Sequence, residues 1–233
     1  MAKKILLVGG NSGVGEQVLN RQLGAGDEVF CASRERGSIV DSEHCHWQAY
    51  DATDPMQTLD LPEVLDGFVY CPGSISLKPF ARLGDEDFQR DLEVNYLGCS
   101  RTLRMALPSL KRSERASVVL FSTVAVQTGL PFHASIAGAK GAVEGFARAL
   151  AAELSPAIRV NCLALSLTDT PMADHLLNSD VKRQASAERH PLKRIGNAGE
   201  VADAVKFFLG NESGFVTGQV LQIDGGMSSL KLL

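Results

Sequence analysis

The sequence lacks the features that mark secreted, membrane-spanning or disulfide-stabilised proteins. Its 233 residues include five cysteines, an odd and scattered set, so we expect reduced, buried thiols rather than a disulfide framework. No apolar run approaches the roughly 20 residues that a helix needs to cross a membrane. The N-terminal residues also show no cleavage pattern of a signal peptide. These absences predict a cytoplasmic protein without a membrane partner.

An excess of charge of one sign is also missing. The formal net charge is −4 at pH 7, and acidic and basic residues are interspersed. A face that binds nucleic acid needs a concentration of lysine and arginine that this pattern does not provide. Hydrophobic residues make up 45% of the chain, and no linker or low-complexity run divides it. We therefore expect one domain over residues 1–233, with a full core and a small-molecule substrate.

The most informative pattern that is present lies near the N-terminus. An apolar run over residues 5–8 is typical of a parallel strand buried on both faces, and a glycine-rich turn follows it directly. Such a turn brings the backbone close to a pyrophosphate, and the next helix directs its N-terminus at the phosphates. Because a second strand is expected over residues 27–32, this βαβ unit predicts dinucleotide binding. The expected cofactor-binding residues of the turn are Gly9, Asn11, Ser12, Gly13, Val14 and Gly15.

The residues after the second strand indicate which dinucleotide binds. At this place an acid would bind the 2′-hydroxyl of the adenine ribose, whereas Ser33 followed by Arg34 suits a 2′-phosphate. NADP(H) is therefore favoured over NAD(H), and the simpler alternative is that Arg34 is a solvated loop residue. His44 and His46 share one face of the next expected strand. No metal site is predicted there, because no further pair supplies the remaining ligands.

The rest of the chain alternates strands and helices. Strands are expected over residues 44–51, 67–70, 117–121, 158–164 and 220–223, and helices over 85–110, 135–154 and 200–209. This alternation predicts a single α/β domain, a Rossmann fold with a doubly wound, mainly parallel sheet flanked by helices. The polar connection over residues 167–197 has the size of a mobile substrate lid. Its side chains mix apolar and basic types: Met172, His175, Leu176, Leu177 and His190.

In order and spacing these motifs resemble the short-chain dehydrogenase/reductase family, particularly its 3-oxoacyl-carrier-protein reductase-like members. The resemblance covers essentially the whole chain, although Val8 replaces the threonine that opens the family's glycine motif. It implies that Asn95 and Lys140 belong to a catalytic tetrad, with Lys140 also holding the nicotinamide ribose. The resemblance further implies cofactor contacts at Asp51, Gly73 and Thr170.

The departures from the family are concentrated around the chemistry. Ile136 stands four residues before Lys140, where the family has the tyrosine that acts as general acid or base. Thr123 replaces the substrate-polarising serine and keeps its hydroxyl, while Leu165 and Ser166 replace a proline and a glycine. General acid catalysis contributes roughly 10² to 10⁴-fold, whereas orientation of the reactants contributes ~7 to 11 kcal/mol. Loss of the tyrosine therefore need not abolish hydride transfer.

Three interpretations remain open. The favoured one is an NADP(H)-dependent oxidoreductase that acts on a small carbonyl or alcohol substrate. Its proton would come from His133, Ser135, Thr123 or a water held by Asn95 and Lys140. The second is a nucleotide-binding sensor or inactive subunit without redox chemistry, and the third is a non-redox lyase or isomerase. Function depends on the site rather than on the fold, so the residues alone do not decide between them.

The helix expected over residues 135–154 also bears on assembly. Small residues at Ala137, Gly138, Gly141 and Gly145 permit close approach of another helix. The resembled family pairs this helix and the preceding long one between subunits. A homodimer or homotetramer is therefore expected.

Overall fold

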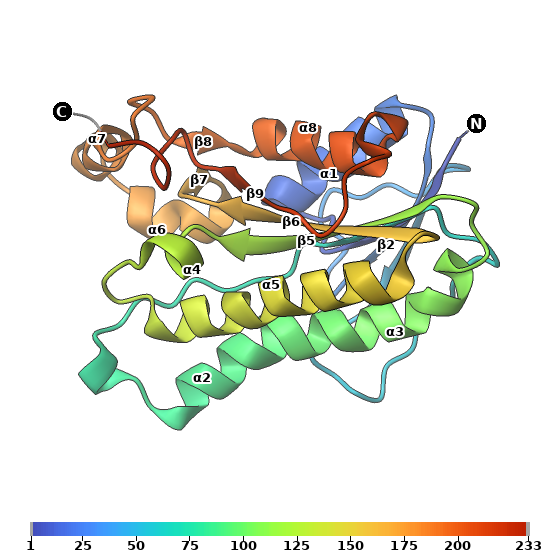
Figure 1. Cartoon of the computed structure of the whole chain (residues 1–233), viewed down its shortest axis with the longest axis horizontal. Helices are drawn as coiled ribbons and strands as arrows, with labels where there is room; N and C mark the ends of the chain where they lie inside the picture. The colour runs from blue at the N-terminus through green and yellow to red at the C-terminus, as the bar shows by residue number, and fades with distance from the viewer. Residues whose placement is uncertain (1, 232–233) are drawn as a thin grey trace.

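The computed structural model describes residues 2–231 and is built on a parallel sheet (Figure 1). The sheet has seven strands in the order β3-β2-β1-β4-β5-β6-β9, and every neighbouring pair runs parallel. The order reverses between β1 and β4, which opens a crevice at the carboxyl ends of these strands. The strands are β1 (Lys4–Val8), β2 (Glu28–Ser33), β3 (Cys45–Ala49), β4 (Gly67–Tyr70), β5 (Ala116–Thr123), β6 (Ile158–Leu165) and β9 (Val220–Ile223).

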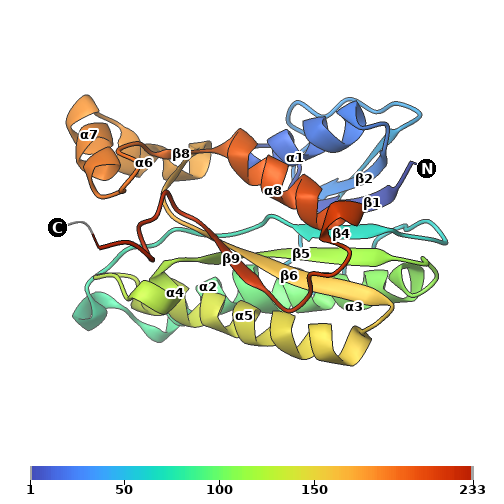
Figure 2. The same cartoon turned by 45° about the horizontal axis from the view of Figure 1, so that its top comes forward.

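Helices cover both faces of the sheet, and Figure 2 shows α1 and α8 on one side with α3 and α5 on the other. Successive strand residues point to opposite faces. Leu6 accordingly packs in one apolar cluster with Leu103 and Val143, while Leu7 packs in a second cluster with Val201. These clusters confirm the expected doubly wound α/β domain. The four helices are α1 (Gly13–Gly24), α3 (Gly98–Leu110), α5 (Ala134–Leu154) and α8 (Ala198–Leu209).

The helix expected over residues 85–110 is interrupted in its middle. It consists of α2 (Asp85–Leu92), a π-helical turn η2 (Glu93–Leu97) and α3. The chain packs tightly at this point, because a Cβ on Gly98 would lie 2.7 Å from the Tyr70 hydroxyl oxygen and 2.9 Å from the Ala52 carbonyl oxygen. Asn95 lies within the turn and is 1% exposed. Isolated π-turns often occur at functional sites.

Two other expectations are refined. Strand β5 continues through Ser122 and Thr123, because their backbone pairs with Ala164 and Leu165 of β6. The short crossover expected between β3 and β4 contains no helix within residues 50–66.

None of the helices in residues 2–231 is both long and apolar enough to cross a membrane. The remaining short helices outside residues 167–197 are η1 (Phe80–Arg82), α4 (Ala125–Thr128) and η4 (Asn211–Ser213).

The expected lid is folded rather than a bare connection. It contains β7 (Thr168–Asp169), η3 (Pro171–Ala173), α6 (Asp174–Leu177), α7 (Asp180–Glu188) and β8 (Gly196–Asn197). Strands β7 and β8 pair in parallel as a separate small sheet. Ser179 caps the N-terminus of α7, and its hydroxyl accepts a hydrogen bond from the Lys182 backbone N–H at 3.3 Å. Figures 1 and 2 place this segment at the end of the molecule to which the strands point.

Candidate active site

A cavity of about 740 Å³ lies at the carboxyl ends of the central strands. Doubly wound sheets bind ligands at this edge. One continuous lining joins the glycine-rich turn, the residues after β2 and β3, the ends of β5 and β6, and the lid. The lining includes Gly9, Asn11, Ser12, Gly13, Val14, Gly15, Ser33, Arg34, Asp51, Gly73, Thr123, His133, Ile136, Lys140, Thr170 and His190.

The glycine-rich turn has the geometry of an anion cradle. Gly9 and Gly13 have φ values of 79° and 54°, in the left-handed region that favours glycine. A Cβ on Gly15 would lie 1.9 Å from the Gly9 carbonyl oxygen, so this position tolerates no side chain. Ser12 precedes α1, and its hydroxyl caps no backbone N–H within the described chain. The first N–H groups of α1 thus remain available to a phosphate at the cavity wall.

Ser33 and Arg34 have different roles at the adenosine end. The Ser33 hydroxyl donates to the Glu35 carbonyl oxygen at 2.7 Å and accepts from Trp47 Nε1 at 2.9 Å, so it fixes the loop. Arg34 is exposed and makes no ion pair or hydrogen bond through its side chain among residues 2–231. Its guanidinium therefore remains available to a ligand. The neighbouring Glu35 also lines the cavity, which the sequence interpretation had not included.

Asp51 forms a turn that leaves part of its carboxylate available. Its Oδ1 accepts from the Thr53 hydroxyl at 2.7 Å and the Thr53 backbone N–H at 2.9 Å. These hydrogen bonds, aided by the charge of Arg34, lower the pKa of Asp51. Within the described residues Oδ2 of the ionised carboxylate accepts no hydrogen bond, and Asp51 lies on the cavity wall. It is thus placed to accept from a donor such as an amino group.

Asn95 and Lys140 both approach Gly73, although only Lys140 is part of the cavity lining. Asn95 Nδ2 donates to the Asp91 carbonyl oxygen at 2.8 Å and to the Ser74 hydroxyl at 3.0 Å. Its Oδ1 is buried and has no partner within residues 2–231. A Cβ built on Gly73 would lie 3.4 Å from this oxygen and 3.8 Å from Lys140 Nζ. A buried acceptor beside an ammonium group calls for a hydroxyl or a water between them.

Lys140 itself is held by the end of β5. Its Nζ donates to the Phe121 carbonyl oxygen at 3.0 Å, and the side chain is buried. Burial lowers the pKa of Lys140, since the low-dielectric surroundings disfavour the charged form. Thr123 lies at the end of the same strand, and its Oγ1 accepts from the Ala125 N–H at 3.3 Å. The Thr123 proton is therefore free to donate towards the cavity.

Ile136 forms an apolar part of the cavity wall, and no nearby tyrosine takes over its position. It is 5% exposed. The Tyr70 hydroxyl donates to the Val94 carbonyl oxygen at 2.8 Å, and the Tyr50 hydroxyl is bonded to Thr102 at 2.8 Å. Burial raises the pKa of both phenols. Both hydroxyls are thus engaged in the core and unsuited to acid catalysis.

The structure separates the two proton donors predicted beside Ile136. His133 lines the cavity, and its Nδ1 lies 2.7 Å from the Pro131 carbonyl oxygen. A carbonyl only accepts, so Nδ1 carries the proton and Nε2 remains open. Ser135 is instead buried, and its hydroxyl donates to Asp91 Oδ2 at 2.6 Å. The structure therefore places Ser135 against α2 and outside the cavity lining.

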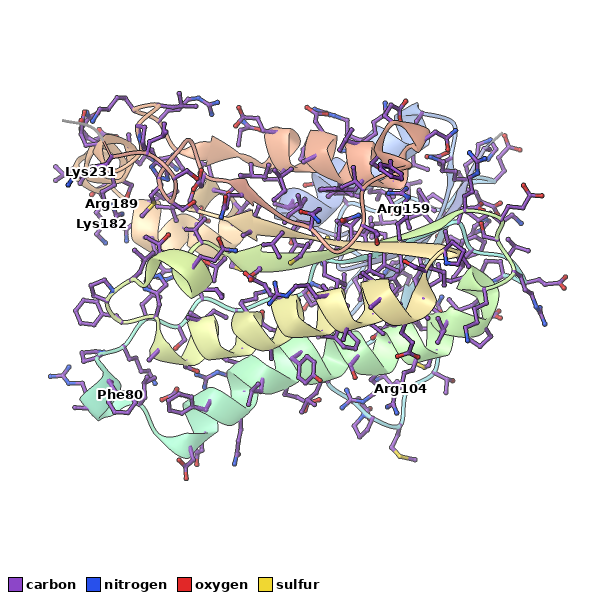
Figure 3. All side chains as sticks on the ribbon, viewed as in Figure 1. Phe80, Arg104, Arg159, Lys182, Arg189 and Lys231 are labelled. Atoms are coloured by element: carbon purple, nitrogen blue, oxygen red, sulfur yellow. The ribbon has the colours of Figure 1, made fainter. Side chains whose placement is uncertain are left out.

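The lid closes the cavity from the opposite side. A Cβ on Gly13 would lie 3.4 Å from Thr170 Cβ, so Thr170 faces the glycine-rich turn. Met172 reaches the Gly73 side, where its Cε would lie 3.9 Å from an added Cβ. Lys182 and Arg189 also contribute to the lining, and Figure 3 shows both at the lid end of the molecule.

Two cavity residues form a pair that the sequence interpretation missed. His190 Nε2 lies 3.0 Å from Ser166 Oγ, and His190 Nδ1 lies 2.8 Å from the Ser186 carbonyl oxygen. The sequence marked Ser166 as a departure from the family pattern and His190 as a lid residue. The two residues are 24 positions apart and the lid helices lie between them, so no local pattern could have paired them.

The fold and the cavity lining define the class of this protein as a Rossmann-type α/β domain. The chain belongs to the short-chain dehydrogenase/reductase family: the family model described as "Enoyl-(Acyl carrier protein) reductase" matches residues 57–228. A tropinone reductase homologue of Arabidopsis thaliana is 30% identical over 96% of this chain and 92% of the relative. The matching proteins are described as reductases, which supports an oxidoreductase.

Solved structures support the same fold. Ligand-free aldohexose dehydrogenase of Thermoplasma acidophilum superposes with a TM-score of 0.88 at 24% identity, covering 100% of this chain and 96% of that chain. ElxO with NADP bound gives a TM-score of 0.87 at 24% identity, covering 99% of this chain and 100% of that chain. At these identities the likeness concerns the fold alone.

Proposed function

We propose that this protein is an NADP(H)-dependent oxidoreductase that acts on a small carbonyl or alcohol substrate through an atypical active site. The observation that carries the proposal is the continuity of the cavity. The same 740 Å³ space is lined by the phosphate-cradling turn and by Thr123, His133 and Ile136. A bound cofactor and a compact substrate therefore fit next to each other.

The residues present fit a nicotinamide dinucleotide. The uncapped start of α1 suits its pyrophosphate, and the orphaned Asn95 Oδ1 beside Lys140 suits a hydroxyl or water next to its ribose. When bound, this cofactor supplies hydride transfer. The chain's own contribution is orientation: Thr123 donates to a substrate oxygen, Lys140 holds the ribose, and Ile136 excludes water from one wall.

The preference for NADP(H) rests on Arg34. Arg36 is paired with Asp41, whereas Arg34 has no ion pair in the described chain and lines the cavity. A free guanidinium binds a phosphate through paired hydrogen bonds. NADP in the ElxO structure, which shares this fold, is consistent with that assignment. The adjacent Glu35 carboxylate repels a 2′-phosphate, so it reduces the preference that Arg34 creates.

A binding and turnover experiment tests the function. Fluorescence titrations with NADPH and NADH measure both affinities, and absorbance of the reduced nicotinamide follows turnover with carbonyl and alcohol panels. We expect tighter binding of NADPH and substrate-dependent change with at least one panel member. Tight binding without turnover on either panel would favour the second candidate, a nucleotide-binding protein without redox chemistry, which the absence of a tyrosine at Ile136 supports.

We also propose that the protein assembles as a homodimer or homotetramer and works in the cytoplasm. Gly138 and Gly145 lie on the exposed face of α5, and a Cβ on either would meet no atom within 4 Å. The five cysteines are free in the structure, which suits a reducing compartment. Light scattering at micromolar concentration checks the assembly, and a monomeric mass would count against it.

A further inference from the structure

Ser166 and His190 have the geometry of a proton-transferring pair. Because the Ser186 carbonyl oxygen accepts from His190 Nδ1, the ring proton is fixed on that nitrogen. Nε2 of the neutral ring is therefore the acceptor for the Ser166 hydroxyl at 3.0 Å. A hydroxyl bonded to an imidazole whose other nitrogen is held by a third group is the arrangement that activates an oxygen for proton exchange.

The pair lies at the substrate end of the cavity. Leu165 is the register partner of Thr123, and its carbonyl oxygen accepts from the Val124 N–H at 3.1 Å. Ser166 is the next residue, so it follows the strand end directly beside the Thr123 segment. Both Ser166 and His190 line the cavity that Thr123 and Ile136 also line. The imidazole itself is 2% exposed, so it communicates with the cavity chiefly through the serine.

A buried carboxylate stands behind the histidine. The turn after β9 packs on the imidazole, since a Cβ on Gly225 would lie 3.8 Å from the ring atom Cδ2 of His190. Asp224 in this turn is buried, which alone would raise its pKa, but hydrogen bonds from Ser228 and Gly226 lower the pKa of Asp224 overall. Asp224 is therefore an ionised carboxylate in the turn that packs against His190.

We propose that Ser166 is the catalytic hydroxyl that replaces the absent tyrosine, with His190 as the proton acceptor behind it. This inference rests on the proposed oxidoreductase function. In alcohol oxidation the substrate O–H bond breaks and its proton passes to Ser166 Oγ, while the Ser166 proton passes to His190 Nε2. The carbinol C–H bond breaks as hydride leaves to an oxidised nicotinamide cofactor, and the C=O bond forms. Carbonyl reduction is the same sequence in reverse.

The kinetic test compares Ser166→Ala, Ser166→Thr and His190→Gln with the unmodified protein, using NADPH and an accepted carbonyl substrate. We expect Ser166→Ala and His190→Gln each to lower kcat by ~10² to 10⁴-fold, the range of acid–base catalysis, with KM changed by less than about threefold. The double variant should be no slower than either single one, because the two groups act as a unit. Ser166→Thr keeps the hydroxyl and should restore much of the rate.

His175→Gln is the matched control. It changes a histidine of the same lid that is exposed and lies outside the cavity lining, so its kinetics should be unchanged. Two readouts do not depend on turnover. NADPH affinity by fluorescence titration should be the same in all variants, and the ¹⁵N NMR resonance of His190 Nε2 should shift in Ser166→Ala while that of Nδ1 stays in place.

The outcomes separate the two proposals. An active protein in which Ser166→Ala or His190→Gln keeps kcat within about threefold overturns the pair and leaves the oxidoreductase function standing. A weakened NADPH affinity in both variants would also overturn it, since the residues would then be structural supports of the cofactor site. A protein that binds NADPH but turns over no panel member overturns the oxidoreductase function and this inference with it.

Discussion

The part of the cavity proposed to bind the cofactor, around the glycine-rich turn and Asp51, differs in construction from the part proposed to carry the chemistry, around Ile136 and Ser166. We call these parts the cofactor end and the chemical end. The cofactor end is made largely of backbone: glycines at positive φ, uncapped helix N–H groups and an Asx turn at Asp51. The chemical end is made of side chains: Ile136 forms part of the wall, and Ser166, which follows β6, is hydrogen-bonded to His190 of the lid. Backbone geometry tolerates little change, whereas side chains at a rigid edge exchange freely. Under the proposed function, one scaffold retains a cofactor site while the group that exchanges the proton changes position.

The largest effect is expected from a substitution that disrupts the glycine-rich turn. Gly15→Ala forces a Cβ to 1.9 Å from the Gly9 carbonyl oxygen, so the turn must open. We expect NADPH affinity to fall by at least ~100-fold and the melting temperature to drop, because overpacking costs about 1 to 3 kcal/mol or more. Fluorescence titration and thermal unfolding measure both.

Gly24→Ala is the control for this change. It lies in the same helix, and an added Cβ would meet nothing within 4 Å. Alanine is favoured over glycine in a helix by roughly 0.5 to 1 kcal/mol, so this variant should be as stable as the unmodified protein or slightly more so. Equal NADPH affinity in Gly15→Ala would contradict the proposed phosphate cradle.

The second prediction concerns a tyrosine introduced at position 136, where the family has one. Ile136→Tyr places a phenol four residues before Lys140, whose charge lowers the pKa of the new hydroxyl. In a His190→Gln background we expect kcat to rise by about 10²-fold, while the unmodified protein gains little because Ser166 already exchanges the proton. Ile136→Phe adds the ring without the hydroxyl and should give no rescue. A large gain in the otherwise unmodified protein would mean that the present site lacks an efficient proton donor.

The difference between contacts that are local in sequence and contacts between distant segments explains which parts of the site the sequence could predict. The strand, glycine turn and helix at the N-terminus are local in sequence, so their pattern predicts their contacts. The pairing of Ser166 with His190 depends on how the lid folds back, which no local periodicity encodes. The π-turn at Asn95 was missed for a similar reason: it arises where Gly98 packs against Tyr70, a contact between distant segments.

The third prediction sharpens the contrast within the cofactor end. Arg34→Asp removes the free guanidinium and adds repulsion to a 2′-phosphate. Hydrogen bonds to charged groups contribute about 1.5 to 3 kcal/mol, so NADPH should bind roughly 10 to 100-fold more weakly while NADH is little affected. Arg104→Ala removes an exposed arginine of α3 that Figure 3 shows far from the lid, and it should change neither affinity. Equal affinity of the unmodified protein for NADPH and NADH would contradict the assignment.

The smallest effect concerns the charge of Asp51. Hydrogen bonds from Thr53 lower its pKa in the folded protein below the ordinary 3.8. Ionised Asp51 therefore contributes stability that is present above pH 3.8 and is lost as the pH falls through the lower folded pKa. Asp51→Asn keeps a carbonyl acceptor for Thr53 and removes only the charge. Because the side chain is partly exposed, we expect the variant to lose less than about 1 kcal/mol at pH 7. Denaturant unfolding at pH 7 and pH 3 measures the difference, which should shrink at the lower pH. A difference that grows on acidification would show that Asp51 is protonated more readily in the folded protein than in the unfolded chain.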